Sequence, residues 1–113
     1  MGCIASSATA APKWLDQYCS PTGDFCTGLY RSHGRMTTDL STFSFVGKYQ
    51  LCVNPPRAAK DCKMFRLRHV SHGILRGRVS LSRHFDLRQR GRYSVTFHSS
   101  GFRIGDSLHF RKG

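Results

Sequence analysis

Four cysteines between residues 19 and 62 constrain the fold of this chain more than any other feature. The sequence has five cysteines in 113 residues, and Cys3 lies in an N-terminal segment of different composition. The remaining four, Cys19, Cys26, Cys52 and Cys62, allow three pairings, and proximity along the chain favours Cys19–Cys26 and Cys52–Cys62. Structural zinc sites usually begin with cysteines two to four residues apart, a spacing that these cysteines lack. We therefore expect two disulfides, no bound metal and an oxidising compartment.

A hairpin around Cys52 and Cys62 supports the second pair. Residues 48–53 and 64–68 alternate between apolar and polar side chains, which is the period of half-buried strands. The intervening segment contains two adjacent prolines, which cannot continue a strand ladder and therefore indicate a turn. When Cys52 faces Cys62, Tyr49 lies opposite Phe65. The two patterns agree and predict a cross-strand disulfide.

Short alternating segments continue along the chain, and none has an apolar stripe of helical period. We expect a disulfide-closed loop over 14–26 and an irregular segment over 69–77. Strands are expected at about 25–30, 36–45, 49–53, 63–68, 78–85, 93–97 and 102–110. This spacing predicts an all-β fold, an immunoglobulin-like β-sandwich of about seven short antiparallel strands in a single domain over residues 14–113.

The segment Gly91-x-Tyr93-x-Val95 follows a polar turn. It has the form of a tyrosine corner, in which the hydroxyl group bonds to upstream backbone. An ordinary buried strand tyrosine is the alternative.

Residues 1–13 precede the domain. Ala8-Thr9-Ala10 has the small-x-small form of a signal-peptidase site, so this segment is interpreted as the tail of a signal peptide or as a disordered N-terminus. The first interpretation places the true translation start upstream. Gly2 and Cys3 also fit a pattern for double lipidation, which would attach the chain to a membrane.

The charge balance is strongly basic. Eighteen Lys and Arg face six Asp, giving a net charge of +12. Such a surface attracts anionic polymers: cell-wall polymer, acidic polysaccharide or nucleic acid. The alternative is a solvated surface without a ligand. Arg66 and Arg68 are expected to share one strand face, Arg76 and Arg78 another. The predicted polyanion-binding residues are Arg66, Arg68, Arg76, Arg78, Arg88, Arg90 and Arg92.

Catalysis finds little support in the sequence. Six Asp and no Glu provide no recognisable carboxylate pair, and paired cysteines leave no thiol nucleophile. Six histidines among many arginines are the residue types of a ribonuclease, but no spacing selects a histidine pair. We expect no enzymatic activity and no cofactor.

Four motifs carry a resemblance to a known group of proteins. They are Cys19-x-Pro-Thr-Gly-Asp24-x-Cys26, Tyr49-x-Leu-Cys52-Val-x-x-Pro56, Cys62-x-x-Phe65 and Gly91-x-Tyr93-x-Val95. Over about residues 17–110 the chain resembles small exported immunoglobulin-like proteins of high-GC Gram-positive bacteria. The resemblance implies the fold and export, and it brings no functional residues with it.

These observations predict a non-catalytic module, secreted or at the cell surface, that binds a partner or has a structural role. An Arg-rich surface would contact the anionic polymer. The alternative is a secreted cationic effector, either membrane-active or ribonuclease-like.

Overall fold

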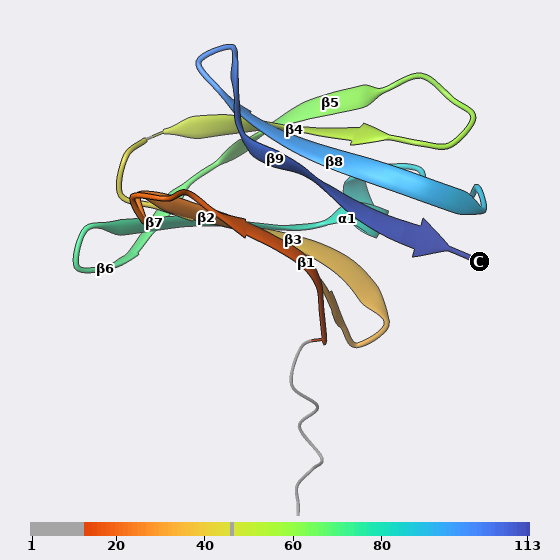
Figure 1. The fold of residues 1–113 in the computed structure, drawn as a ribbon, viewed down its shortest axis with the longest axis horizontal. Coiled ribbons are helices and arrows are strands. Elements are labelled where there is room, and N and C mark those ends of the chain that lie inside the picture. The colour runs from red at the N-terminus through yellow and green to blue at the C-terminus, as the bar shows by residue number, and fades with distance from the viewer. Residues whose placement is uncertain (1–12, 46) are drawn as a thin grey trace, which may run out of the picture.

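The computed structural model describes residues 13–45 and 47–113. The expectations for the signal-peptide tail, Gly2 and Cys3 concern positions outside these residues. Within the described residues the chain forms nine strands and one helical turn (Figure 1). The strands are β1 (Lys13–Cys19), β2 (Phe25–Ser32), β3 (Arg35–Thr42), β4 (Lys48–Asn54), β5 (Asp61–Arg66), β6 (Arg68–Ser71), β7 (Ile74–Ser80), β8 (Gly91–Ser99) and β9 (Phe102–Lys112), and the helical turn is α1 (Leu81–His84).

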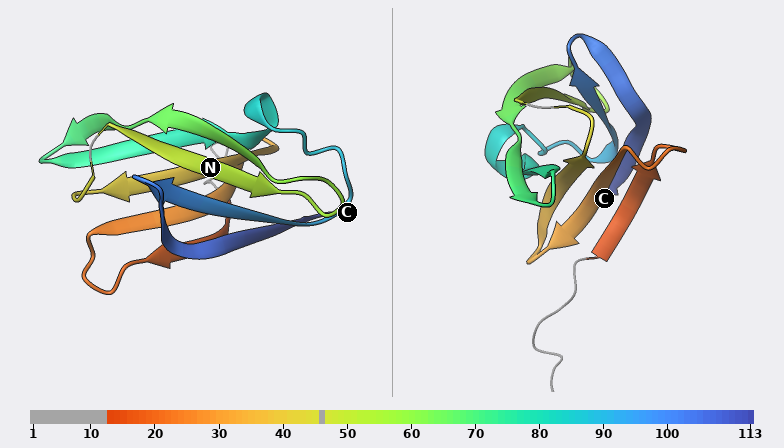
Figure 2. Two further views of the ribbon diagram at one scale, coloured as in Figure 1. Left: turned by 90° about the horizontal axis from the view of Figure 1, so that it is seen from above. Right: turned by 90° about the vertical axis from the view of Figure 1, so that its left-hand side faces the viewer.

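The strands form two sheets that pack face to face as a β-sandwich. One sheet has the order β1-β2-β3-β7-β6 and the other β5-β4-β8-β9, and every pairing is antiparallel. Figure 2 shows β1 and β9 at one side of the sandwich, while β5, β6 and β7 lie at the other. The all-β sandwich expected from the sequence is therefore confirmed.

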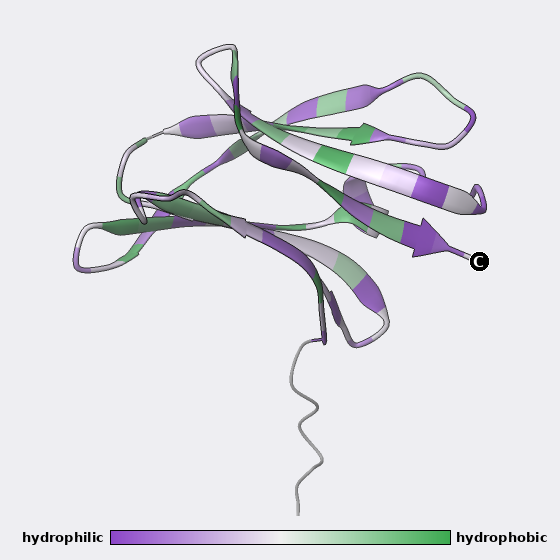
Figure 3. Cartoon of the chain, viewed as in Figure 1, coloured by the Kyte–Doolittle hydropathy of each residue, from purple (hydrophilic) through white to green (hydrophobic). Residues whose placement is uncertain are grey.

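The core lies between the two sheets, because alternate residues of each strand point inward. Leu29 and Leu40 of the first sheet and Leu51 and Phe97 of the second are fully buried. The outward positions of β3, β4 and β8 are mostly polar. Figure 3 shows this alternation along β8, where green bands are separated by paler and purple ones. The period-two pattern in the sequence is thus the cause of the two-layer packing.

Both predicted disulfides are present. Cys19 lies opposite Cys26 in the β1–β2 pair, and Cys52 lies opposite Cys62 in the β4–β5 pair. Tyr49 pairs with Phe65, as the hairpin register required. Because disulfides form and persist in oxidising compartments, the two bonds point to such an environment.

The polar turn before β8 contains the expected tyrosine corner. The Tyr93 hydroxyl donates a hydrogen bond of 2.7 Å to the carbonyl oxygen of Gln89, four residues upstream. The ring itself is completely buried and stacks on Phe110 at 4.9 Å between ring centres. This bond fixes the path of the chain from α1 into β8.

The sequence-based boundaries were wrong in three places. Residues 13–19 form β1 instead of a loop, and a bulge between Trp14 and Asp16 hides the alternation there. Residues 69–77 form a hairpin instead of an irregular segment, because His72 and Gly73 both have positive φ and make a tight turn. The end of the predicted 78–85 strand is the helical turn α1.

No helix in the described part of the chain is long and apolar enough to cross a membrane.

Candidate anion-binding groove

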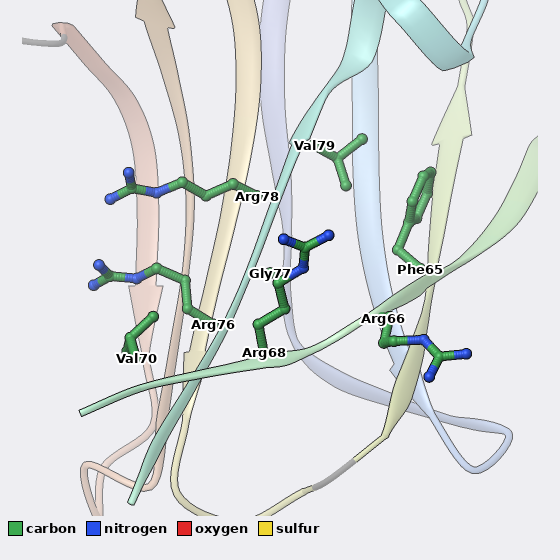
Figure 4. Close-up of a pocket in the computed structure, with 8 residues that line it drawn as sticks. All are labelled: Phe65, Arg66, Arg68, Val70, Arg76, Gly77, Arg78 and Val79. Carbon is green, nitrogen blue, oxygen red and sulfur yellow. The ribbon is translucent and has the colours of Figure 1, made fainter. Parts of the chain in front are cut away.

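The two lateral sides of the sandwich differ. At one side β1 meets β9, and the Asp16 carboxylate accepts a 2.9 Å hydrogen bond from the backbone N–H of His109. At the other side, β6 is only four residues long, and the buried Leu67 carries the chain from one sheet to the other. A hollow of about 570 Å³ lies here, lined by residues of β5, β6 and β7. We call it the arginine groove (Figure 4); it is lined by Phe65, Arg66, Arg68, Val70, Arg76, Gly77, Arg78 and Val79.

Two arginines of the groove share one carboxylate. Arg76 and Arg78 are alternate residues of β7, so they project from the same face, and Figure 4 shows them side by side. Asp39, opposite Arg78 on β3, lies 3.4 Å from Nε of Arg76 and 3.5 Å from Nε of Arg78. The Asp39 side chain is 11% exposed, whereas those of Arg76 and Arg78 are 38% and 56% exposed. The Asp39 carboxylate is therefore largely buried, and the side chains of the two arginines that it pairs with are more exposed to solvent.

Arg68 adds a third positive charge on the short strand. Its backbone pairs directly opposite Arg76 across β6 and β7, but the two side chains extend to opposite sides of β7. Figure 4 shows its side chain extending along β7 toward Gly77, on the side that faces Phe65. Among the described residues, the groove arginines have Asp39 as their sole ion-pair partner. Positive charge in the groove is thus in excess.

Arg66 is the fourth arginine that lines the groove, and it belongs to the other sheet. It ends β5, whereas Arg68 begins β6, and the buried Leu67 separates them. The expectation that these two arginines share one strand face was wrong, because the chain changes sheets between them. Arg66 nevertheless lines the same groove as Arg68.

A second hollow continues the positive surface past α1. It shares Phe65, Arg78 and Val79 with the arginine groove and adds two basic residues, Arg35 and Arg83. His33 and His84 also line it. Sequence reasoning left these four residues out of the predicted site, since Arg35 and His33 lie in the β2–β3 hairpin, far from β7 along the chain.

The other three predicted arginines lie elsewhere. Arg88 lines a different hollow beside Lys112, and Arg90 is an exposed residue of the loop before β8. Arg92 lies within β8, opposite Arg111 of β9. None of the three lines the arginine groove, so the structure does not bring them together with the other four.

Arg88 also has its own partner. Its guanidinium group donates two 2.9 Å hydrogen bonds to the Asp86 carboxylate. These bonds, together with the backbone N–H of Arg88, lower the pKa of Asp86 to about 2. The charge of Arg88 is therefore locally balanced.

The described residues contain no cluster of metal ligands. No group of three or more His, Cys, Asp or Glu among them could hold a metal ion. His98 lies in β8 with Nε2 3.1 Å from Thr96 Oγ1, and desolvation together with Lys60 and Arg103 lowers its pKa. His33 and His84 line the second hollow together with Arg35, Arg78 and Arg83.

Comparison with protein-family models, with curated proteins and with solved structures gave no match.

Proposed function

We propose that this protein is an exported, non-catalytic immunoglobulin-like module that binds anionic polymers through the arginine groove. The observation that carries the proposal is the meeting of Arg66, Arg68, Arg76 and Arg78 in one open groove whose paired carboxylate is Asp39 alone among the described residues. An anionic chain would neutralise charges that the protein leaves unbalanced.

Strand order supports the immunoglobulin-like assignment. The order β2-β3-β7-β6 facing β5-β4-β8-β9 corresponds to the two sheets of that fold, with β1 as an additional edge strand. The Tyr93–Gln89 bond is the tyrosine corner of the same fold. One feature differs from antibody domains: both disulfides join neighbouring strands within a sheet, and neither crosses the core. Export is supported by these two disulfides.

The shape of the site favours a polymer over a single small anion. The groove is open to solvent and continues into the second hollow, which adds Arg35 and Arg83. A chain with repeated negative charges can contact several of these arginines at once and release bound counter-ions at each. We therefore expect binding that weakens steeply as salt rises.

The test compares two triple variants with the same change in net charge. Arg68→Ala/Arg76→Ala/Arg78→Ala alters the groove, and Arg88→Ala/Arg90→Ala/Arg92→Ala alters the distant arginines. Binding of fluorescent polyphosphate is measured by anisotropy at about 0.02–0.2 M salt. We expect the groove variant to reduce the slope of log K against log salt by about 2–3, and the distant variant to leave most of it intact. Equal losses in the two variants would contradict a localised site.

A nucleolytic effector is the second candidate, and one observation favours it. His33 and His84 line the second hollow together with Arg35, Arg78 and Arg83, which are the residue types that move protons and stabilise phosphorane charge. The assay is cleavage of a fluorogenic RNA by the wild type and by His33→Ala/His84→Ala. Cleavage that disappears in this variant would favour the effector, whereas RNA binding without cleavage favours the module.

A further inference from the structure

The arginine groove contains an unpartnered strand edge as well as positive charge. β7 pairs with β3 along its length from Leu75 to Ser80, but its pairing with β6 stops at Arg76. Within the described residues, Gly77–Ser80 therefore has a sheet partner on one side only. Exposed strand edges of this kind accept an added strand from another chain.

The turn between β6 and β7 shows which backbone groups face this edge. His72 and Gly73 both have positive φ, the two-residue turn in which the flanking residues Ser71 and Ile74 point their backbone groups at each other. Backbone direction alternates along a strand, so Ile74 and Arg76 face β6, and the backbone N–H and C=O of Arg78 face the open edge.

A side-chain hydrogen bond between β3 and β7 supports this orientation of the β7 backbone. The Thr38 hydroxyl of β3 donates to the carbonyl oxygen of Val79 at 3.4 Å, so the backbone groups of Val79 face β3. Arg78 and Ser80, one position either side, therefore face away from β3. The backbone N–H and C=O of Arg78 therefore point to the open edge of β7, which borders the arginine groove.

We propose that the anionic polymer is an acidic protein segment that adds to β7 as an extra strand along Gly77–Ser80. This inference rests on the proposed function and names its partner class. Figure 4 shows Arg68 on the side of β7 that faces Phe65, next to the open edge, so an acidic chain complements this edge. A second copy of this protein does not, because its net charge is +12.

The two faces of the edge define the sequence that would fit. A residue paired with Arg78 projects to the face of the sheet that carries the Arg76 and Arg78 side chains. Figure 4 shows both of these side chains extending toward β3, where Asp39 lies, so a carboxylate on this face is attracted by their charge without direct contact. A residue paired with Val79 projects to the opposite face, toward Phe65, where an aliphatic side chain packs in the hollow. The preferred segment therefore alternates acidic and aliphatic residues.

Synthetic peptides can separate backbone pairing from charge. The probe is an eight-residue peptide of alternating Glu and Val, compared with two forms of identical charge. One carries N-methyl groups on the Glu residues, whose amides would face β7, and the other carries the same number on the Val residues, whose amides would face away. We expect the first to bind at least about tenfold more weakly and the second to bind like the unmodified peptide.

A pair of protein variants provides an independent arm. Arg78→Pro removes the edge N–H together with the charge, and Arg78→Ala removes the charge alone; proline is tolerated where the N–H faces an open edge. Melting curves confirm that both variants fold. The proline variant should bind the unmodified peptide more weakly than the alanine variant does.

The possible outcomes distinguish the two proposals. If both methylated peptides bind like the unmodified one, or if polyphosphate binds and no peptide does, strand addition is wrong and the anion-binding groove stands. If neither polyphosphate nor any peptide binds at about 0.02 M salt, the proposed function fails as well.

Discussion

Tyr49 of β4 crosses the interior of the sandwich and lies directly against Gly77 of β7. A Cβ atom added to Gly77 would lie 2.5 Å from Cε1 and 2.7 Å from the hydroxyl oxygen of Tyr49. The Tyr49 ring is buried, and its hydroxyl has no hydrogen-bond partner among the described residues. This contact sets the spacing between the two sheets immediately behind the arginine groove, because Gly77 is part of the groove wall.

Gly77→Ala should therefore destabilise the fold. The new methyl group would overlap a buried ring that has little room to move, and overpacking of this kind costs about 1–3 kcal/mol. Chemical denaturation of the variant measures the loss. In a Tyr49→Leu background most of the additional cost should vanish, because the ring is gone. A wild-type melting curve for Gly77→Ala would contradict the contact.

The burial of Tyr49 should make the stability of the fold sensitive to alkaline pH. Burial, with a smaller contribution from the Asp39 carboxylate, raises the pKa of Tyr49 above its usual value of 10.0. The unfolded chain ionises this group at about pH 10 and the folded chain does not, so the free energy of unfolding should fall as pH rises above about 10.

Tyr49→Phe is the matched variant for that effect. It should lose this part of the alkaline dependence and remain at least as stable at neutral pH, since the removed hydroxyl had no partner. Denaturant titrations of both proteins between about pH 7 and pH 11 supply the comparison. Identical alkaline slopes would show that Tyr49 is not responsible.

The disulfides should contribute measurably to stability. Replacing Cys52 and Cys62 together by Ser should cost about 2–3 kcal/mol, and Cys19 with Cys26 about the same, because both bonds close short loops. Reduction of the intact protein should raise its mass by about four hydrogens. Free thiols at all four positions in protein purified from an oxidising compartment would refute both bonds.

The Asp86–Arg88 pair gives a prediction about a single titration. NMR detection of the Asp86 side-chain carboxyl carbon should give a pKa of about 2 in the wild type. In Arg88→Ala it should move up toward the ordinary value of 3.8, because the guanidinium hydrogen bonds are the largest cause of the shift. Since the pKa is lowered by folding, the pair stabilises the fold above about pH 4 and loses its effect as pH falls toward 2. No change in the variant would mean that the pair is not formed in solution.

The sequence predicted those features that depend on local alternation. The pairing of Cys52 with Cys62 and of Tyr49 with Phe65 followed from the period of two adjacent strands and one turn. β1 was missed because its bulge at Leu15 breaks that period. The register of a hairpin is a local property, so it could be read before the fold was known.

The arginine groove was predicted only in part, because its grouping depends on contacts between residues that are far apart along the chain. Its four arginines were named, but their grouping with Asp39 depends on β3 lying beside β7, about forty residues apart along the chain. Proximity in sequence also suggested Arg88, Arg90 and Arg92, which lie near other elements. The pairing of strands that are far apart along the chain leaves no periodic signal in one sequence, so the grouping of these arginines required the structure.

The most direct test of the anion-binding groove is to observe the arginine side chains themselves. Two-dimensional NMR resolves the Nε–Hε groups of arginines, and polyphosphate can be titrated into labelled protein at about 0.05 M salt. We expect the Nε–Hε signals of Arg68, Arg76 and Arg78 to shift together and saturate at one concentration, while those of Arg88, Arg92 and Arg111 move little. Shifts of similar size across all arginines, without saturation at the groove, would contradict it.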